Sequence, residues 1–393
     1  MNASADVCVI GAGVMGLFAA LELAEHGADV LVVDRGVPGA QASNANAGTL
    51  AVQNKRNEAL PLVLASLPLW EEMSDRLGFE VEYERRGGMR VAHSDADVAK
   101  LRASVSEQAA LGARVEWLDR DEIATAAPYL AQTIQAASYC PDDGMANPFA
   151  VTRAALRACR HAGCRIWPGW PVVDFRQVDD DRVACVSSRG TITAAHLLIA
   201  AGAWTERLTA RAGRTLALSH DVLQAVITDS GPELFPHVVT HVRGNLTLKQ
   251  QRTGRVLIGG AWKGSGELDT GTSQVVHEQL RGNLAWALRT VPALATTRVL
   301  RAWTGFEGRT PDRLPLLGPL PGTPRIHALG CAGGGFTLSP IAGRLAADLI
   351  ARRPPTLPVD KYLIGGRFIE HTSASTELPG GVDVADLAKR GSS

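Results

Sequence analysis

The 393-residue sequence has no excess of charge, since 40 lysines and arginines balance 40 aspartates and glutamates. This balance argues against nucleic acid or an anionic membrane as the main partner. The six cysteines form no Cys-x-x-Cys pair, so no metal or iron–sulfur site is expected. No apolar run approaches the roughly 20 residues that span a bilayer. Because the first apolar run begins near Met1, we expect no signal peptide and a cytoplasmic protein, with peripheral membrane association left open.

The first pattern that is present lies at the N-terminus. A β-branched apolar run at 7–10 enters a glycine turn, a helical pattern follows as far as Gly27, and a second apolar run at 30–33 ends in Asp34. The turn reads Gly11-Ala12-Gly13-Val14-Met15-Gly16. A G-x-G-x-x-G turn between a strand and a helix, with an acidic residue about 20 positions later, is typical of dinucleotide-binding units.

Each residue of this unit has a physical task. Gly11 permits the tight turn, Gly13 lets a pyrophosphate approach the backbone, and Gly16 lets the helix pack closely on the strand. The N-terminus of the helix offers N–H groups and a positive dipole to the phosphates. Asp34 is placed to accept hydrogen bonds from an adenosine ribose, and its charge repels a 2′-phosphate. The unit therefore predicts binding of FAD or NAD rather than NADP.

A second glycine loop, 333–340, stands between an apolar run at 326–330 and a helical pattern at 339–352. Two such loops can hold both ends of a long cofactor, and the second helix would point its dipole at a ring that becomes negative on reduction, as a flavin does. The alternative is that the loop at 333–340 is only a structural turn that packs a helix on the sheet. The polar segment 36–49 is expected to wrap the ligand, although a surface loop is also compatible with its composition.

The rest of the chain predicts two kinds of sheet. A buried run at 195–204 indicates a further parallel strand, whereas alternation between 216 and 261, with turns at 244–245 and 253–254, indicates antiparallel hairpins. This antiparallel part is expected to form a second, inserted domain. Further elements are expected at these positions: helices at 58–77, 96–111, 119–127, 147–163 and 273–288, and strands within 80–92, 172–175 and 183–186.

Several motifs, taken together and in order, resemble the D-amino acid oxidase superfamily of FAD-dependent amine oxidoreductases. The motifs are the first glycine turn with Asp34, 43–48, 143–144 with 147–148, 198–204, 303–306, 310–318 and 333–340. The similarity covers residues 6–368. The superfamily includes glycine oxidase, D-amino acid dehydrogenase, the sarcosine oxidase β-subunit, hydrogen-cyanide synthase and the catalytic subunits of opine oxidases. Within it, Asn-Ala-Gly at 46–48 resembles the dehydrogenase and opine-oxidase-like branch.

The resemblance implies an α/β fold, in which a Rossmann-type FAD-binding domain carries an inserted antiparallel-sheet α+β substrate domain. We expect the FAD-binding domain at 1–86, 144–214 and 300–360, the substrate domain at 87–143 and 215–299, and a C-terminal tail at 361–393.

The resemblance also implies the residues that hold FAD. The ADP half is assigned to Gly11, Ala12, Gly13, Val14, Met15, Gly16, Asp34 and Arg35. The path from pyrophosphate to flavin is assigned to Ser43, Asn44, Asn46, Ala47 and Gly48, the adenine to Val173, the ribityl side to Ala201, Gly202 and Trp204, and the flavin pyrimidine edge to Gly334, Gly335, Phe336 and Thr337. Because 143–150 contains no histidine, non-covalent FAD is expected.

The implied reaction transfers the Cα–H of an unprotonated amine as hydride to flavin N5, and the imine then hydrolyses. The substrate would be a D-amino acid, an N-alkyl or imino acid, or an opine. No acid–base residue is assigned, because positioning and electrostatics carry this chemistry. Two further readings stay open: a nicotinamide-dependent dehydrogenase, which the second glycine loop disfavours, and a non-catalytic flavoprotein subunit. A partner subunit or separate electron acceptor is also possible.

One position departs from the superfamily pattern. Many members carry a carboxylate-binding arginine where this chain has Glu307, and the nearest arginine is Arg309. One hypothesis is that Arg309, together with Lys249, holds the substrate carboxylate while Glu307 meets a second, cationic or polar group. The alternative is that Glu307 and Arg309 pair with each other. Gly48 and Thr49 complete the candidate substrate-binding residues.

Overall fold

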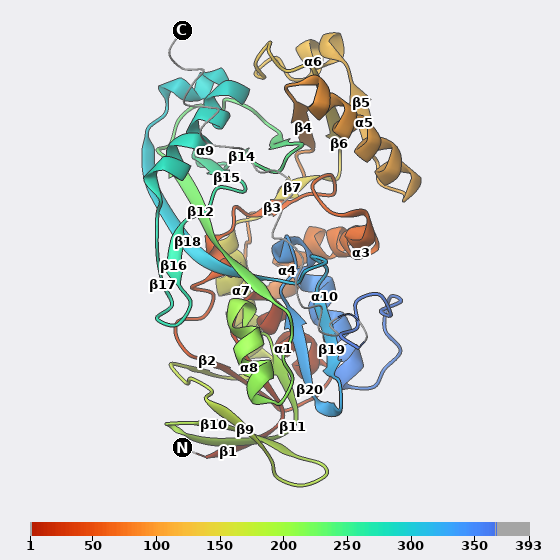
Figure 1. Cartoon of the computed structure of the whole chain (residues 1–393), viewed down its shortest axis with the longest axis vertical. Coiled ribbons are helices and arrows are strands. Elements are labelled where there is room, and N and C mark those ends of the chain that lie inside the picture. Colours follow the sequence, from red (N-terminus) through yellow and green to blue (C-terminus); the bar gives the residue numbers. More distant parts are fainter. Residues whose placement is uncertain (1, 366, 368–393) are drawn as a thin grey trace.

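The computed structural model describes residues 2–365 and 367, so most of the tail assigned to 361–393 lies outside the described residues. Two eight-stranded sheets follow one another along the long axis of the molecule (Figure 1). The N-terminus lies beside the first sheet. In the described part of the chain, no helix is both long and apolar enough to cross a membrane.

The first sheet is built on parallel strands in the order β20-β11-β1-β2-β8, with β19 antiparallel at the β20 edge and β10 and β9 extending from β11. The strands are β1 (Ala3–Ile10), β2 (Val30–Asp34), β8 (Arg165–Pro168), β9 (Asp174–Gln177), β10 (Val183–Ser187), β11 (Gly190–Ile199), β19 (Leu316–Leu320) and β20 (Thr323–Gly330). The parallel strand expected at 195–204 is confirmed as β11, which pairs with β1 along its length.

Both faces of this sheet are buried, which explains its continuous apolar runs. Val7 and Val9 of β1 point to a helical layer, whereas Cys8 and Ile10 point to the opposite core. The helical layer contains α1 (Val14–Glu25), α3 (Leu60–Glu71), α7 (Pro148–His161) and α10 (Gly335–Ile350). The short helix α8 (Thr205–Arg211) lies against β9 and β11.

The second sheet has the order β18-β12-β15-β14-β13-β4-β6-β5 and is antiparallel except between β13 and β4. The strands are β4 (Gly88–Ala92), β5 (Glu116–Leu118), β6 (Ala136–Cys140), β12 (Ser219–Thr228), β13 (Val238–His241), β14 (Thr247–Gln250), β15 (Val256–Gly259) and β18 (Val299–Arg309). The hairpin turns expected at 244–245 and 253–254 are confirmed, since β13, β14 and β15 pair antiparallel around them.

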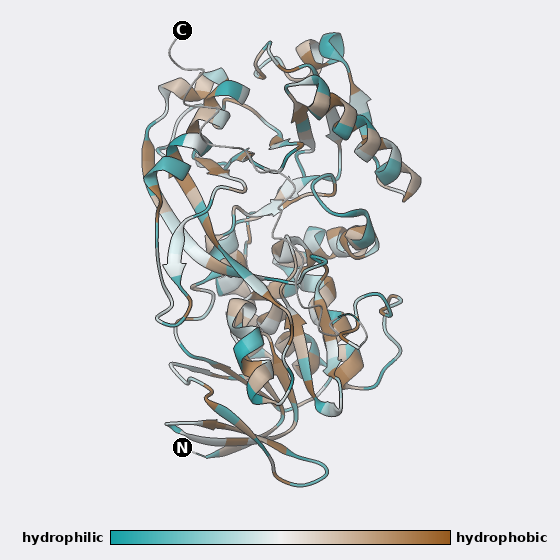
Figure 2. Ribbon diagram, in the orientation of Figure 1, coloured by the Kyte–Doolittle hydropathy of each residue, from teal (hydrophilic) through white to brown (hydrophobic). Residues whose placement is uncertain are grey.

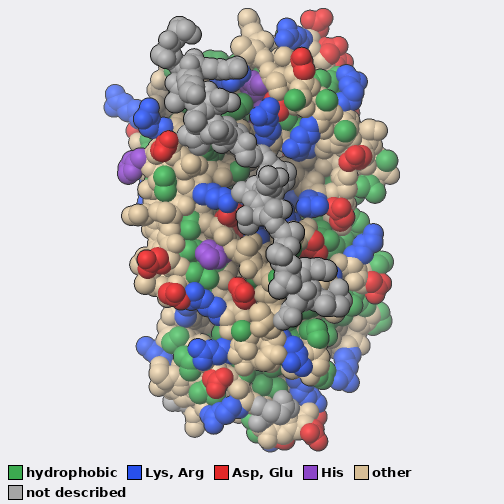
Figure 3. Space-filling model, in the orientation of Figure 1, with side chains coloured by type: hydrophobic (Ala, Val, Ile, Leu, Met, Phe, Trp, Pro, Cys, Tyr) green, Lys and Arg blue, Asp and Glu red, His purple; other side chains and the backbone are tan. Residues whose placement is uncertain are grey.

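Three helices accompany the second sheet: α5 (Asp95–Ala110), α6 (Arg120–Ala126) and α9 (His277–Thr290). The buried residues of α5 include polar ones, Asp97 and Gln108, beside Leu101, and the helix carries both teal and brown residues (Figure 2). Positive and negative side chains are interspersed on the face shown in Figure 3, in agreement with the balanced charge.

The domain boundaries stay a prediction, but the boundary expected at residue 300 falls inside a single strand. Residue 300 falls at the start of β18, which pairs with β12 from end to end in the second sheet. These two long strands run side by side towards α8 in Figure 1. Near its end, β18 reaches the first domain: a Cβ at Gly308 would meet the carbonyl group of Gly202. The junction is therefore formed along β18.

Several expected elements have other bounds. The helix expected at 58–77 is divided at Glu72 into α3 and α4 (Met73–Leu77). Only 88–92 of the segment 80–92 is a strand, and the helix expected from 273 starts at His277, because 272–274 pair with 265–267. The remaining elements are short: α2 (Ala42–Ala45), β3 (Thr49–Leu50) with β7 (Gly144–Met145), and β16 (Ser265–Glu267) with β17 (Thr272–Gln274).

Candidate active site

Both glycine loops open onto one cavity of about 460 Å³. Gly13 and Val14 line it at the N-terminus of α1, and Gly334 and Gly335 line it at the N-terminus of α10. Neither helix has an acidic residue in its first turn, so no negative charge within the helix ends offsets their positive dipoles. The cavity can therefore receive the phosphates and the ring of one extended ligand at two helix ends.

Asp34 closes the first glycine turn from the end of β2. Its Oδ2 accepts a hydrogen bond from the backbone N–H of Ala12 at 2.8 Å, and its Oδ1 accepts one from Gly36 at 2.8 Å. Gly11 has a φ of 112°, and a Cβ there would overlap the carbonyl of Ala200. A Cβ at Gly16 would overlap the carbonyl of Gly11, which explains the glycine spacing.

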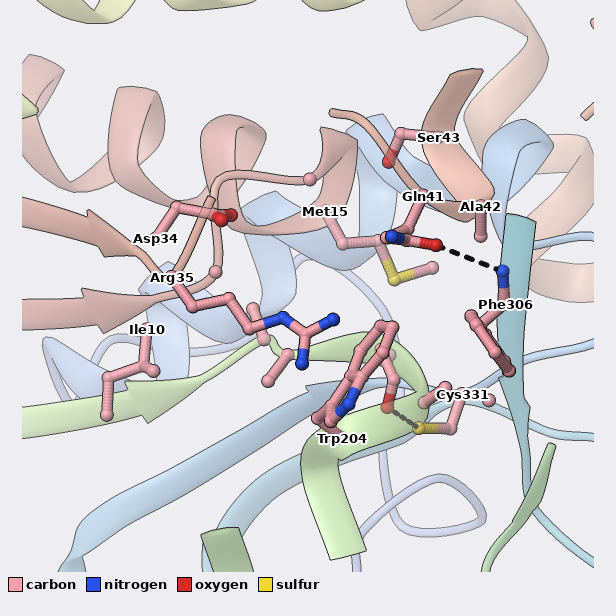
Figure 4. Close-up of a pocket in the computed structure, with 18 of the residues that line it drawn as sticks. Ile10, Met15, Asp34, Arg35, Gln41, Ala42, Ser43, Trp204, Phe306 and Cys331 are labelled. Carbon is pink, nitrogen blue, oxygen red and sulfur yellow. Dashed lines mark hydrogen bonds between the residues drawn. The ribbon is translucent and has the colours of Figure 1, made fainter. Parts of the chain in front are cut away.

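The segment after β2 folds back over α1. Ser43 Oγ accepts a hydrogen bond from the N–H of Val14 at 3.0 Å, and the side chain lines the cavity, where its own proton is available to a phosphate. Gln41 Oε1 accepts from the N–H of Phe306 at 3.3 Å, which ties α2 to β18 (Figure 4). The segment is therefore part of the cavity wall rather than a free surface loop.

An Arg–Trp pair forms the wall beyond Asp34. The guanidinium of Arg35 lies 3.6 Å from the ring centre of Trp204 (Figure 4). The indole N–H of Trp204 donates to the carbonyl of Leu268 at 2.8 Å, and its ring meets Phe306 edge-on at 5.4 Å. Burial lowers the pKa of Arg35 from its usual value, but a guanidinium remains charged.

The second loop is fixed by buried contacts. Gly334 caps α10 with a φ of 80°. Thr337 Oγ1 donates to the carbonyl of Thr49 at 3.1 Å, and the carbonyl of Thr337 accepts from Ser66 and Trp70 at 2.7 and 2.9 Å. The start of α10 is thereby connected to β3 and α3.

Most residues assigned to FAD line this one cavity. They are Gly11, Gly13, Val14, Met15, Asp34, Arg35, Ser43, Asn46, Val173, Ala201, Gly202, Trp204, Gly334, Gly335 and Phe336. Six others are not among the residues that line it: Ala12, Gly16, Asn44, Ala47, Gly48 and Thr337. Asn44, for example, accepts from Thr152 of α7 at 3.0 Å, which gives it a structural contact.

Lys249 is buried in the second sheet with only 2% of its surface exposed. Its Nζ donates to Thr49 Oγ1 at 2.6 Å, and Thr49 Oγ1 lies 3.0 Å from Thr247 Oγ1. In the described part of the chain this ammonium has no carboxylate partner. Burial lowers the pKa of Lys249 to about 7.

Glu307 and Arg309 pair with each other, which is the alternative that the sequence left open. Glu307 lines the cavity, whereas Arg309 donates to Glu307 at 2.9 Å and to Asp221 of β12 at 2.7 Å. Asp221 also pairs with Lys263 at 2.5 Å. The Arg309 guanidinium is thus already shared between two carboxylates.

Several residues at or beside the cavity were not assigned from the sequence, and among them are three that bear polar or reactive groups. Gln41 and Cys331 line it, and Lys55 contacts Gly334. Cys331 has a φ of 56°, unusual for a residue other than glycine, and burial raises the pKa of its thiol to about 12. The unusual backbone is invisible in the sequence, but Gln41 stands in the polar segment that the sequence did single out.

Comparison with known proteins agrees with this geometry. The family described as FAD dependent oxidoreductase matches residues 6–349. Glycine oxidase from Geobacillus kaustophilus is 28% identical over 362 residues, covering 88% of this chain and 93% of the relative. The sarcosine oxidase β-subunit from Arthrobacter sp. is 27% identical over 359 residues, covering 88% and 87%. The crystal structure of the Geobacillus glycine oxidase superposes with a TM-score of 0.83 at 25% identity and covers 94% of this chain and all of that one.

The fold and the cavity therefore define a flavin-dependent oxidoreductase. The chain belongs to the D-amino acid oxidase family of FAD-dependent oxidoreductases, and its cofactor is FAD. The cavity fits this cofactor, because two helix N-termini, glycines without Cβ atoms and the carboxylate of Asp34 are distributed along its wall. The nicotinamide-dependent reading is thereby set aside. Non-covalent attachment of FAD, the individual cofactor contacts and the cytoplasmic location stay predictions.

Proposed function

We propose that the enzyme oxidises the carbon–nitrogen bond of an amino acid or an N-substituted amino acid: a D-amino acid, an N-alkyl or imino acid, or an opine. FAD, when bound, supplies the hydride acceptor. The protein binds and orients the amine so that its Cα–H faces that acceptor, and the resulting imine hydrolyses in water. The relatives named glycine oxidase and sarcosine oxidase support an amine that carries a carboxylate.

The observation that carries this proposal is the burial of Lys249. Burying an ammonium without a counter-ion costs free energy, and a substrate carboxylate would supply the missing counter-ion. Through Thr49, Lys249 is connected to Thr337 at the start of α10, the expected flavin end of the cavity. We assign the carboxylate to Lys249 rather than to Arg309, because Arg309 already binds Glu307 and Asp221.

Glu307 has a separate proposed role. It lies on the cavity wall, where its carboxylate oxygens can accept further hydrogen bonds although Arg309 occupies part of them. A larger substrate whose distal group is cationic or polar could donate hydrogen bonds to the Glu307 carboxylate. Basic amino acids and opines that carry them match this requirement, so they belong in the substrate panel.

The test is anaerobic reduction of the FAD-loaded enzyme by a panel of D-amino acids, N-methyl amino acids, cyclic imino acids and opines. At least one carboxylate-bearing amine is expected to bleach the visible absorption of the flavin. Lys249→Met should weaken binding of that amine at least tenfold, or about 1.4 kcal/mol, and should change binding of the matched amine without a carboxylate less than twofold. Lys100→Met, at an exposed position of α5, is the matched control. If no amine bleaches the flavin, amine oxidation is wrong.

A further inference from the structure

A second lysine, Lys55, lies at the N-terminus of α10. Its Nζ is 3.5 Å from the carbonyl oxygen of Gly334, a long and weak hydrogen bond. A Cβ added to Gly334 would overlap Nζ, so the absence of a side chain at Gly334 makes room for the ammonium. Since Gly334 caps α10 and lines the cavity, Lys55 lies directly beside the loop expected to face the flavin.

The chain that carries Lys55 is held in place by buried polar groups. Asp143 Oδ1 accepts from the N–H of Val52 at 2.7 Å, and Gln53 Nε2 donates to Asp143 Oδ2 at 3.1 Å. Gln108 of α5 donates to the carbonyls of both Gln53 and Lys55 at 3.2 Å. Because these contacts come from the second domain, the position of Lys55 is fixed by the assembled fold rather than by its own loop.

The Lys55 ammonium has no carboxylate at ion-pair distance among the residues that the structure describes. Burial lowers the pKa of Lys55 to about 8, while Glu307 and Asp143 act in the opposite direction from farther away. The side chain therefore carries its charge at neutral pH. Its positive charge adds to that of the α10 dipole at the same point.

We propose that Lys55 tunes the cofactor: its ammonium stabilises the negative charge that a flavin gathers at its pyrimidine end on reduction, and so raises the reduction potential. The proposal is independent of which amine is oxidised. It needs only that residues 334–337 face the pyrimidine end, as expected from the second glycine loop. Lys55 acts on the electronics of the cofactor and does not take part in proton transfer.

The test compares the FAD-loaded wild-type enzyme with Lys55→Met, Lys55→Arg and the surface control Lys100→Met. Sulfite, which adds reversibly to the oxidised flavin and places negative charge on the pyrimidine end, is titrated by absorbance, and the midpoint potential is measured against reference dyes. Lys55→Met should bind sulfite at least tenfold more weakly and lower the potential by about 30 mV for each factor of ten. Lys55→Arg should retain most of the wild-type affinity, and Lys100→Met should equal the wild type.

Two results would overturn the proposal. One is an unchanged sulfite affinity and an unchanged reduction potential in Lys55→Met. If carboxylate binding alone weakens in that variant, Lys55 belongs to the substrate site and the proposal is equally overturned. The other needs no variant and applies even if Lys55→Met fails to retain FAD: the reduced wild-type flavin should show the spectrum of the anionic form at pH 7 and below, and a neutral reduced flavin there refutes the idea. These measurements do not use the amine substrate, so their failure is distinct from failure of the proposed function.

Discussion

Arg309 donates from Nε and from Nη2 to the same carboxylate oxygen of Glu307, at 2.9 and 2.8 Å. Its Nη1 binds Asp221, which stands opposite Glu307 in the register of β12 and β18. Two facing carboxylates are thus joined by one guanidinium at the junction of the two sheets. This arrangement gives Arg309 a structural role that the sequence alone could not decide.

Replacing Arg309 with Met should therefore act on stability more than on substrate binding. Glu307 would lose its partner and would face Asp221, which keeps only its pair with Lys263. This should lower the free energy of unfolding by about 2 kcal/mol, less than for a fully buried pair. Urea denaturation of the holoenzyme measures the first effect, and anaerobic titration should show a substrate Kd raised less than severalfold. Adding Glu307→Gln and Asp221→Asn should restore stability. A large rise in Kd at unchanged stability would instead favour Arg309 as the carboxylate partner.

Asp34→Asn should weaken FAD binding. The carboxylate accepts backbone N–H groups on both oxygens, and an amide would present a donor to one of them. The loss of a hydrogen bond to a charged acceptor costs about 1.5–3 kcal/mol, so the Kd for FAD should rise roughly ten- to a hundredfold. Titration of the apoprotein by flavin fluorescence measures this. Asp360→Asn, at an exposed position, should leave the Kd unchanged; an equal effect of the two variants would contradict the role of Asp34.

Carboxylate binding should depend on the ionisation of Lys249. Burial lowers the pKa of this ammonium to about 7 in the free enzyme, so its positive charge is present below that pH and is lost above it. The Kd of a simple carboxylate inhibitor without an amine should therefore rise towards tenfold per pH unit above pH 7. Equilibrium titration of the holoenzyme from pH 6 to pH 9 checks this. In Lys249→Met the dependence should disappear, and a variant with the wild-type slope would assign the titration to another group.

The stability of the second domain should fall in mild acid. His93 is 7% exposed, its ring lies 5.3 Å from that of His241, and neither of its nitrogens has a hydrogen-bond partner in the described part of the chain. Burial lowers the pKa of His93 to about 4. In the unfolded chain the imidazole binds its proton near pH 6.5, so stability is complete above that value and is lost as the pH falls towards 4.

The loss should reach about 1.4 kcal/mol per pH unit for each such histidine. Urea denaturation between pH 8 and pH 5 measures the slope, and His93→Leu should flatten it. His161→Leu, on the exposed side of α7, is the control and should keep the wild-type slope. A His93→Leu variant with an unchanged slope would assign the acid sensitivity to other groups.

The parts of the site that the sequence predicted are those whose geometry is local. The glycine turn at 11–16 and Asp34 form one strand-turn-helix-strand unit, so spacing alone defines their relative positions. The second loop is also a glycine turn between a strand and a helix. Both loops line one cavity, as the hypothesis of a long cofactor requires. The polar segment 36–49 was correctly associated with this wall, since Ser43 binds the first turn of α1.

The remaining features depend on contacts between distant segments. The pairing of Arg309 with Asp221 follows from the register of β12 against β18, and the burial of Lys249 follows from the loop at Thr49 covering its strand. Lys55 was missed for the same reason, because only the assembled domains bring it to Gly334. The bounds predicted for the helices at 58–77 and 273–288 were wrong, because a local break at Glu72 and a small two-stranded pairing before His277 compete with helical periodicity.

Thr49 and Thr337, which meet beside the cavity, are separated by 288 residues. During synthesis the first glycine turn emerges early, but its counterpart on α10 leaves the ribosome only near the end of translation. A chain that ends before α10 therefore lacks one of the two loops that line the cavity, and we expect it to bind FAD weakly. A ligand that binds only the finished fold stabilises it. The cellular concentration of FAD should therefore affect how much of the newly made polypeptide survives proteolysis.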